Sequence, residues 1–365
     1  MVNPNFNSTT TTGLTAAVPN YAVAAKTTDG DFSQDENRWT NTKANDYYGF
    51  YANTGEYSSA LNSFATWVIG QGYEADPMDK VMLELINGWG EDTFLSILWN
   101  MLVVKKMQGD SYAEIIRAES TKLFPKGRLI NLKILNSARM AHITNKKGLL
   151  IRYEYTQADG KIQTFKPDEV LHFCNDRILD EPHGTAVTKS VEWVINKIKQ
   201  AREDYARLLH VTSIRVLYVD EEDTARQNKI KAEYAEAIKK GEVMMITCRP
   251  EDAKFQDLTV PPIDAWIRWL TYLEDHFYKA LGVPKVVLGG TAENTEASAK
   301  VAVIVYEPVW TREISELEAD LWSQLGIRIK VNKQPSLMEN MQSDEAKNTG
   351  QVGFQKNDVA YGGEE

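Results

Sequence analysis

The chain has 365 residues, of which 43% are hydrophobic and 25% are charged, a composition typical of a folded protein with two or three domains. Its formal charge of −10 excludes a general nucleic-acid binder, because such proteins carry a basic excess. The two cysteines, Cys174 and Cys248, belong to no CxxC pair, so the sequence predicts neither a thiolate zinc site nor a redox motif, and both thiols are expected to be buried and reduced.

The N-terminal segment is polar and lacks apolar periodicity. Residues 1–42 are rich in Thr, Asn, Ser and Asp, which predicts a flexible arm. Its start has neither the basic residues nor the apolar core of a signal peptide, and the longest apolar run, residues 95–104, is too short to span a bilayer. We therefore expect a reducing, aqueous compartment and no membrane partner.

The next region, residues 43–185, changes from helical to strand periodicity along its length. Apolar residues recur at helical spacing over residues 47–69, 77–86 and 92–107. The period then falls to two, and turn signals such as Asp159-Gly160 separate short runs. The predicted strands are 111–117, 129–135, 149–155, 163–165 and 170–173. We interpret the region as an antiparallel sheet packed on the preceding helices, so the predicted fold class is α+β.

Two long amphipathic helices frame a small α/β insertion. The helices are predicted over residues 186–210 and 262–281, each with one apolar stripe, and we expect them to lie antiparallel. Between them, strand-like runs at 214–219 and 242–247 flank a charged helix at 221–240. The tryptophan-rich stretch from Trp266 to Trp269 could stack on bases, but its helical spacing favours a core or an interface.

A third long helix is predicted over residues 296–325. It should kink at Pro308, which removes one backbone hydrogen bond from the helix interior. The loop before it contains Gly289-Gly290, and Asn294 or Thr295 can cap the helix. Residues 335–365 are polar and are expected to form a loose tail.

Catalytic motifs are absent from the sequence. It has no GxxxxGK[ST] phosphate loop, GxGxxG, HExxH or GxSxG motif and no calcium-binding loop, so P-loop NTP hydrolysis is excluded and no cofactor is expected. One cluster could serve a metal-dependent hydrolase. Its members are His172, Asp176, Asp180 and His183. The plainer interpretation is a strand end followed by a solvated loop, because the spacing matches no ligand template, and we predict no metal.

Four fragments of the sequence follow one another in a fixed order between about residues 45 and 330. The first is Leu83-Glu-Leu-Ile-Asn-Gly-Trp-Gly90, followed by a helix and the strand Gly109-Asp-Ser-Tyr-Ala-Glu-Ile-Ile-Arg117. Next come Asp159-Gly160 with Phe165-Lys-Pro-Asp-Glu-Val-Leu-His-Phe173, and then Pro182-His-Gly184. The last is Ala280-Leu-Gly-Val-Pro-Lys-Val-Val-Leu-Gly289, after the second of the paired helices. In this order and at this spacing, the fragments resemble the portal protein family of tailed phages over about residues 45–330. We can match no counterpart to the N-terminal arm in the family, and the region after residue 330 is short for a crown.

The resemblance implies a portal fold with an α/β wing, a two-helix stem, a small α/β clip and a kinked long helix that leads to a crown. The implied regions are an arm at 1–42, a wing at 43–185, stem helices at 186–212 and 261–282, a clip at 213–260, a tunnel loop at 283–296, the kinked helix at 297–334 and a tail at 335–365. The tunnel-loop residues expected to face DNA are Lys285, Glu293, Asn294, Thr295, Glu296 and Lys300. The clip residues expected to contact partners are Glu221, Glu222 and Asp223.

The resemblance also implies a function and partners. It implies a non-enzymatic subunit of a twelve-membered ring at one capsid vertex, through which the genome is packaged and ejected. The implied partners are further copies of the chain, the major capsid protein, the terminase large subunit, a head–tail adaptor and double-stranded DNA in transit. The location would be the virion, and the host cytoplasm during assembly. Twelve copies would carry a formal charge of roughly −120, which suits a channel that lets phosphates slide.

Overall fold

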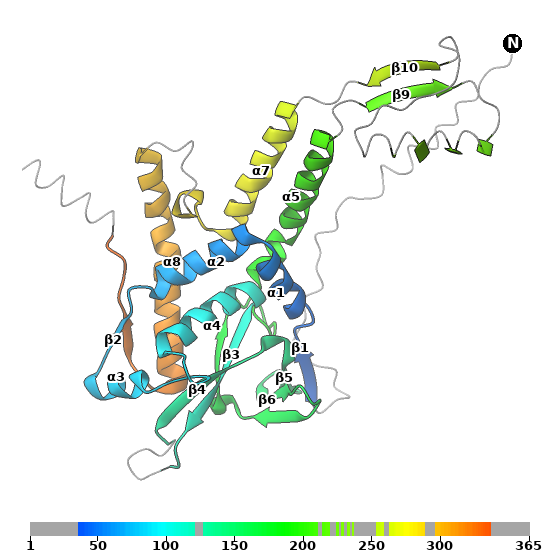
Figure 1. The fold of residues 1–365 in the computed structure, drawn as a ribbon. Coiled ribbons are helices and arrows are strands. Elements are labelled where there is room, and N and C mark those ends of the chain that lie inside the picture. The colour runs from blue at the N-terminus through cyan, green and yellow to red at the C-terminus, as the bar shows by residue number, and fades with distance from the viewer. Residues whose placement is uncertain are drawn as a thin grey trace, which may run out of the picture. The chain divides into compact units, whose positions relative to one another are not determined.

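A computed structural model describes six stretches of the chain and seven helical positions between 224 and 236. The stretches are residues 36–120, 127–210, 214–219, 253–258, 263–288 and 296–336. The contacts divide the chain into two compact units (Figure 1). Unit 1 comprises residues 1–53, 64–186 and 310–334, and unit 2 comprises residues 54–63, 187–309 and 335–365. Within the described stretches, no helix has the length and apolar character that crossing a membrane requires.

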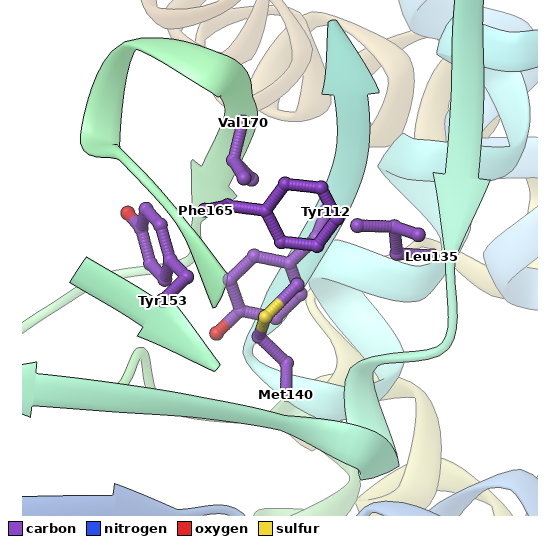
Figure 2. Close-up of a cluster of buried hydrophobic side chains, with 6 residues drawn as sticks. All are labelled: Tyr112, Leu135, Met140, Tyr153, Phe165 and Val170. Atoms are coloured by element: carbon purple, nitrogen blue, oxygen red, sulfur yellow. The ribbon is translucent and has the colours of Figure 1, made fainter. Parts of the chain in front are cut away.

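Unit 1 contains two antiparallel sheets that share a core. The first has the strand order β4-β3-β8, and the second has the order β1-β5-β6-β7. The strands are β1 (Glu36–Thr40), β3 (Asp110–Arg117), β4 (Leu129–Leu135), β5 (Met140–Asn145), β6 (Leu150–Thr156), β7 (Ile162–Phe165) and β8 (Val170–Cys174). A cluster of buried side chains joins the two sheets, because every strand from β3 to β8 contributes to it (Figure 2). Its members are Tyr112, Leu135, Met140, Tyr153, Phe165 and Val170.

Helix α4 (Phe94–Gln108) packs against β3 and is buried on almost every side. Thr93 and Ser96 form a reciprocal capping box at its N-terminus, and Gly109 ends it in the left-handed conformation with φ +91°. Both end signals are visible in the sequence, and the predicted helix at 92–107 is confirmed to within two residues. The neighbouring helices of the unit are α1 (Ala44–Asn53) and α3 (Pro77–Glu84), and β2 (Tyr73–Ala75) pairs with β11 (Ile329–Val331).

Three expectations for this region were wrong. The segment predicted as one helix at 47–69 forms two helices, α1 and α2 (Gly55–Ile69), because the helix is interrupted between Asn53 and Gly55. The strands form two sheets where one sheet was predicted. Strand β5, which belongs to the second sheet, was not predicted because it is buried along almost its whole length and therefore shows no alternation of apolar and polar residues. The end of the expected arm is β1, which pairs with β5 and is fixed by a hydrogen bond from the Trp39 indole to Thr144 Oγ1. Residues 1–35 of the arm lie outside the described stretches.

Unit 2 contains the paired helices α5 (Val187–His210) and α7 (Ile263–Leu281), which lie side by side (Figure 1). Trp193, near the start of α5, contacts His276, near the end of α7, so the helices run antiparallel as predicted. Between them in sequence, β9 (Ile214–Val219) pairs with β10 (Ala253–Leu258). The sequence predicted β9 but missed β10, and the predicted strand at 242–247 lies outside the described part of the chain.

Helix α8 (Glu296–Leu325) has the predicted bounds and contains Pro308. The boundary between the two units falls within this helix, between Val309 and Trp310, one residue after Pro308. The expected kink stays a prediction. Most of the expected tail at 335–365 lies beyond the last described residue, Ser336.

Candidate functional site

Two glycines of the family-like fragments meet in unit 1. A Cβ at Gly109 would lie 2.3 Å from the Gly184 carbonyl oxygen, and a Cβ at Gly184 would lie 2.2 Å from the Gly109 oxygen. Asn175 joins them, because its N–H donates to Gly109 O at 2.8 Å and its carbonyl accepts from Thr185 N–H at 2.7 Å. This close backbone approach holds the loop before α5 against the junction of α4 and β3.

The approach places two histidines on one buried carboxylate. Asp110 opens β3, and its side chain is 2% exposed. His172 Nε2 lies 2.9 Å from Asp110 Oδ1, and His183 Nδ1 lies 3.0 Å from Asp110 Oδ2. The Gly184 N–H adds contacts of 3.2 Å to both oxygens. Such donors satisfy a carboxylate that would otherwise be costly to bury.

Hydrogen bonding determines which ring nitrogens carry protons. His142 donates from Nδ1 to Pro182 O at 2.8 Å, so its Nε2 accepts from the Tyr112 hydroxyl at 2.7 Å. His172 donates from Nε2 to Asp110, so its Nδ1 accepts from the Tyr153 hydroxyl at 3.2 Å. His142 can therefore stay neutral.

The same surroundings shift the pKa values of Asp110, Cys174 and His142. Burial alone would raise the pKa of Asp110, but hydrogen bonds from His172 and His183 outweigh it and hold that pKa well below the usual range. Burial, reinforced by the Asp110 charge, raises the pKa of the Cys174 thiol. Burial lowers the pKa of His142 well below its ordinary value, and the nearby His172 and His183 act in the same direction. Cys174 is a free thiol, as expected, but it is half-buried rather than fully buried.

The hydrolase alternative named four residues, and the structure brings only two of them together. His172 and His183 meet at Asp110, whereas Asp176 forms an exposed ion pair with Arg312 at 2.8 Å. Among the described residues, no three of the four proposed ligands bring ligand atoms within 4.8 Å of one another. Asp110 was not among the predicted site residues, because it lies 62 residues before His172 and meets it only through the pairing of β3 with β8.

In unit 2, side chains of α5 and α7 line an open groove of about 410 Å³. It is lined by Trp193, Lys197, Gln200, Ala201, Asp204, Ala265, Trp266 and Trp269. The predicted apolar stripes explain how the helices pack, since Val191 and Val194 of α5 and Leu273 and Phe277 of α7 are all buried.

Several large side chains of the pair nevertheless remain exposed. The exposed fractions are 52% for Trp193, 52% for Ile267, 42% for Trp269 and 57% for Tyr272. Three ring contacts run from Trp193 through His276 and Tyr272 to Trp269. Trp269 and Tyr272 lie off the buried stripe of Leu273 and Phe277, so α7 has a second apolar face. We call Trp193, Trp269 and Tyr272 the stem aromatic surface.

A charged network joins the helix pair to α2. Arg202 of α5 contacts Glu56 of α2 at 2.6 Å and Glu274 of α7 at 3.5 Å. Glu274 also lies 3.7 Å from Lys285, a residue expected to face DNA. The positive charge of Lys285 is therefore partly balanced by a carboxylate.

The structure describes only part of the predicted channel and clip. Lys285 begins the 3₁₀ turn η3 (Lys285–Leu288), Glu296 begins α8, and Lys300 lies in the first turns of α8. Glu293, Asn294 and Thr295 lie outside the described residues, as do Glu221, Glu222 and Asp223 of the clip. The DNA-facing and partner-contacting roles of these residues stay predictions.

The sequence matches no protein-family model and no curated protein. Solved structures are similar to it. A chain in the neck of a native GTA particle, computed with C12 symmetry, superposes with a TM-score of 0.59 at 19% identity, over 87% of this chain and 92% of that chain. A chain in the virion of a native gene transfer agent particle gives a TM-score of 0.56 at 18% identity, over 86% and 91%. An HK97-family phage portal protein from Corynebacterium diphtheriae gives 0.56 at 14% identity, over 78% and 94%. The chain therefore has the fold of phage portal and particle-neck proteins.

Proposed function

We propose that the chain is a portal subunit that forms a ring at one vertex of a viral capsid and takes no part in catalysis. Double-stranded DNA passes through the ring during packaging and ejection. The ring sits against the major capsid protein, and it is the docking site for the terminase large subunit and later for a head–tail adaptor. Twelve copies per ring is the number that we favour.

The observation that carries this proposal is the extent of the structural similarity. The match to the GTA neck chain covers 87% of this chain and 92% of that one, so it includes both units rather than one common motif. That neck was computed with C12 symmetry, which supports a twelvefold ring here, and a neck of an empty particle was computed with C6 symmetry. Both symmetries are compatible with a closed ring of twelve subunits.

Exposed apolar surface in unit 2 supports association with further copies. The stem aromatic surface leaves three large side chains about half exposed in the single chain. On α8, Val301, Val305 and Val309 are 60%, 68% and 45% exposed, and their four-residue spacing places them on one helix face. Clustered exposed apolar side chains mark interaction sites, and aromatic residues are enriched at the centres of interfaces. Neighbouring subunits would bury these two surfaces.

The charge of the tunnel loop is compatible with the channel role that the resemblance implies. Residues 283–296 and the start of α8 combine Lys285 and Lys300 with Glu293 and Glu296, so the loop has no basic excess. A basic wall would hold phosphates by releasing their counterions and would slow sliding. The loop is proposed to touch the DNA backbone without reading sequence. The acidic start of the clip helix, Glu221 to Asp223, would contact the packaging partners.

Charge reversal in the tunnel loop tests this proposal. The variant Glu293→Lys/Glu296→Lys is expected to slow DNA packaging at low salt, because each added lysine creates a phosphate contact. The defect should ease as salt rises. Glu293→Gln/Glu296→Gln is the matched control and should package at close to the normal rate. An unchanged rate for the lysine variant at low salt would show that the loop does not face the DNA.

A further inference from the structure

Three side chains of metal-ligand type gather at one end of the pairing between β3 and β8. Asp110 and Cys174 are direct cross-strand partners, and His172 lies two residues before Cys174 on the same face of β8. A carboxylate oxygen, an imidazole nitrogen and a thiol sulfur therefore lie within 4.8 Å of one another. The sheet register alone brings them together.

We propose that Asp110, His172 and Cys174 bind a zinc ion, with a water molecule in the fourth position. One oxygen, one nitrogen and one sulfur ligand form a donor set suited to tetrahedral Zn²⁺, with metal–ligand distances of about 2.0–2.3 Å. Those distances place tetrahedral ligand atoms about 3.3–3.8 Å apart. The 2.9 Å between His172 Nε2 and Asp110 Oδ1 would have to lengthen by roughly 0.5 Å, and a separation of up to 4.8 Å would have to shorten by about 1 Å, which side-chain rotations can supply.

The surrounding groups are arranged as outer partners of such a site. His183 Nδ1 holds Asp110 Oδ2 at 3.0 Å, which leaves Oδ1 to bind the ion. Tyr153 lies 3.2 Å from His172 Nδ1, so that nitrogen can carry the proton once Nε2 binds zinc. His183 Nε2 is buried without a hydrogen-bond partner, so His183 is not otherwise committed on its other side.

The proton and charge balance of the step is simple. The Cys174 thiol loses one proton to solvent as its sulfur binds, and the His172 proton moves from Nε2 to Nδ1. One carboxylate and one thiolate then balance the two positive charges of the ion. The sequence predicted no thiolate zinc site, because it contains no CxxC pair. In the proposed site the ligands instead come from β3 and β8, which are far apart in the sequence.

Cobalt binding to the full-length, untagged, metal-free protein tests this proposal. Co²⁺ substitutes for Zn²⁺ and gives a thiolate-to-cobalt charge-transfer band only when a cysteine is bound. Because the chain has two cysteines, any such band in Cys248→Ser can come only from Cys174. We expect Cys248→Ser to show the band at about one Co²⁺ per chain, with loss on addition of Zn²⁺. Absence of the band in Cys248→Ser would overturn the proposal.

Two further variants separate ligands from outer partners. Cys174→Ser should lose the charge-transfer band, and a band that survived this change would also overturn the proposal. His183→Gln should keep the band but bind Co²⁺ about 10–100-fold more weakly, as expected for a residue that orients a ligand. Full affinity in His183→Gln would refute the orienting role that we assign to His183. None of these readouts depends on DNA packaging, so the zinc site and the portal function can fail separately.

Discussion

At the scale of single residues, Gly109 and Gly184 determine where the chain can fold back on itself. Neither position has room for a Cβ, since each would lie less than 2.5 Å from the carbonyl oxygen of the other glycine. The sequence showed both glycines within family-like fragments, but not that they touch. Their contact places His183 next to Asp110, so the polar network depends on it.

We expect Gly184→Ala to destabilise the protein. The new methyl group would also meet the backbone of Asn175 at 2.7–2.8 Å, so the backbone must shift, at a cost of about 1–3 kcal/mol. Gly49→Ala is the control, because that glycine lies within α1 and a Cβ there meets nothing within 4 Å. Chemical unfolding should show lower stability for Gly184→Ala alone. Equal stability of the two variants would contradict the close approach of the backbones.

The lowered pKa of buried His142 should make the stability of the protein depend on pH. Its folded pKa is lowered by burial and by the facing His172 and His183, while Asp110 and the Pro182 carbonyl oppose the shift. As the pH falls below about 6.5, His142 becomes protonated in the unfolded chain but stays neutral in the folded chain. Stability should therefore fall between about pH 6.5 and 5, by up to about 1.4 kcal/mol per pH unit.

Thermal unfolding over this pH range tests the His142 prediction. His142→Gln should flatten the dependence on pH, whereas His276→Gln, a change at an exposed position of α7, should leave it as in the unchanged protein. If His142→Gln keeps the full slope, another group causes it.

At the scale of elements, a buried ion pair joins α4 to the second half of α8. Lys105 Nζ bonds to Glu313, both side chains are less than 5% exposed, and Lys106 Nζ lies 2.8 Å from the other Glu313 oxygen. Burial opposes both charges, yet their attraction raises the pKa of Lys105 and lowers that of Glu313. Each charge is therefore tolerated only because the other is present.

A double-mutant cycle tests this dependence. Lys105→Met or Glu313→Leu alone should cost about 3–5 kcal/mol, because each leaves a buried charge without its main partner. The double variant should lose much less than the sum of the two single changes, since two apolar side chains would then face each other. Free energies of unfolding from urea titrations measure the coupling. Additive losses would contradict it.

Elements with strong local signals could be predicted from the sequence. Helix α4 has a threonine cap before it and a glycine after it, and α8 repeats apolar residues in helical register over its whole predicted range. Strand β5 has no such signal, because it is buried on both faces and includes a polar His142. Strand β1 exists only through its pairing with β5, so no local pattern could show it.

The same limit applies to the candidate sites. The sequence placed His172 and His183 in one cluster but could not supply Asp110, because strand register decides which distant residues meet. The stem helices were predicted from their stripes, but the exposed faces of Trp193, Ile267 and Tyr272 depend on how the two helices pack. Hydrophobic periodicity shows that a face is apolar and not whether the same chain covers it.

At the scale of the whole molecule, the central claim is that this chain works as a closed ring. A 41.3 kDa subunit with two exposed apolar surfaces in unit 2 needs neighbours to bury them. The structural match across both units supports the same conclusion. The proposed ring would also give the acidic chain a function that involves DNA, because the DNA would be passed along rather than bound tightly.

Native mass spectrometry of the purified chain, with negative-stain images of the same sample, tests this claim most directly. The unchanged protein should give particles close to twelve times 41.3 kDa with a central hole. Trp269→Glu/Tyr272→Glu, which places charges on the stem aromatic surface, should give subunits of lower order that keep the helical circular-dichroism signal. The charge-matched control Thr271→Glu/Lys279→Gln, at exposed polar positions of the same helix, should still form rings. Compact monomers of the unchanged chain at high concentration would contradict the account.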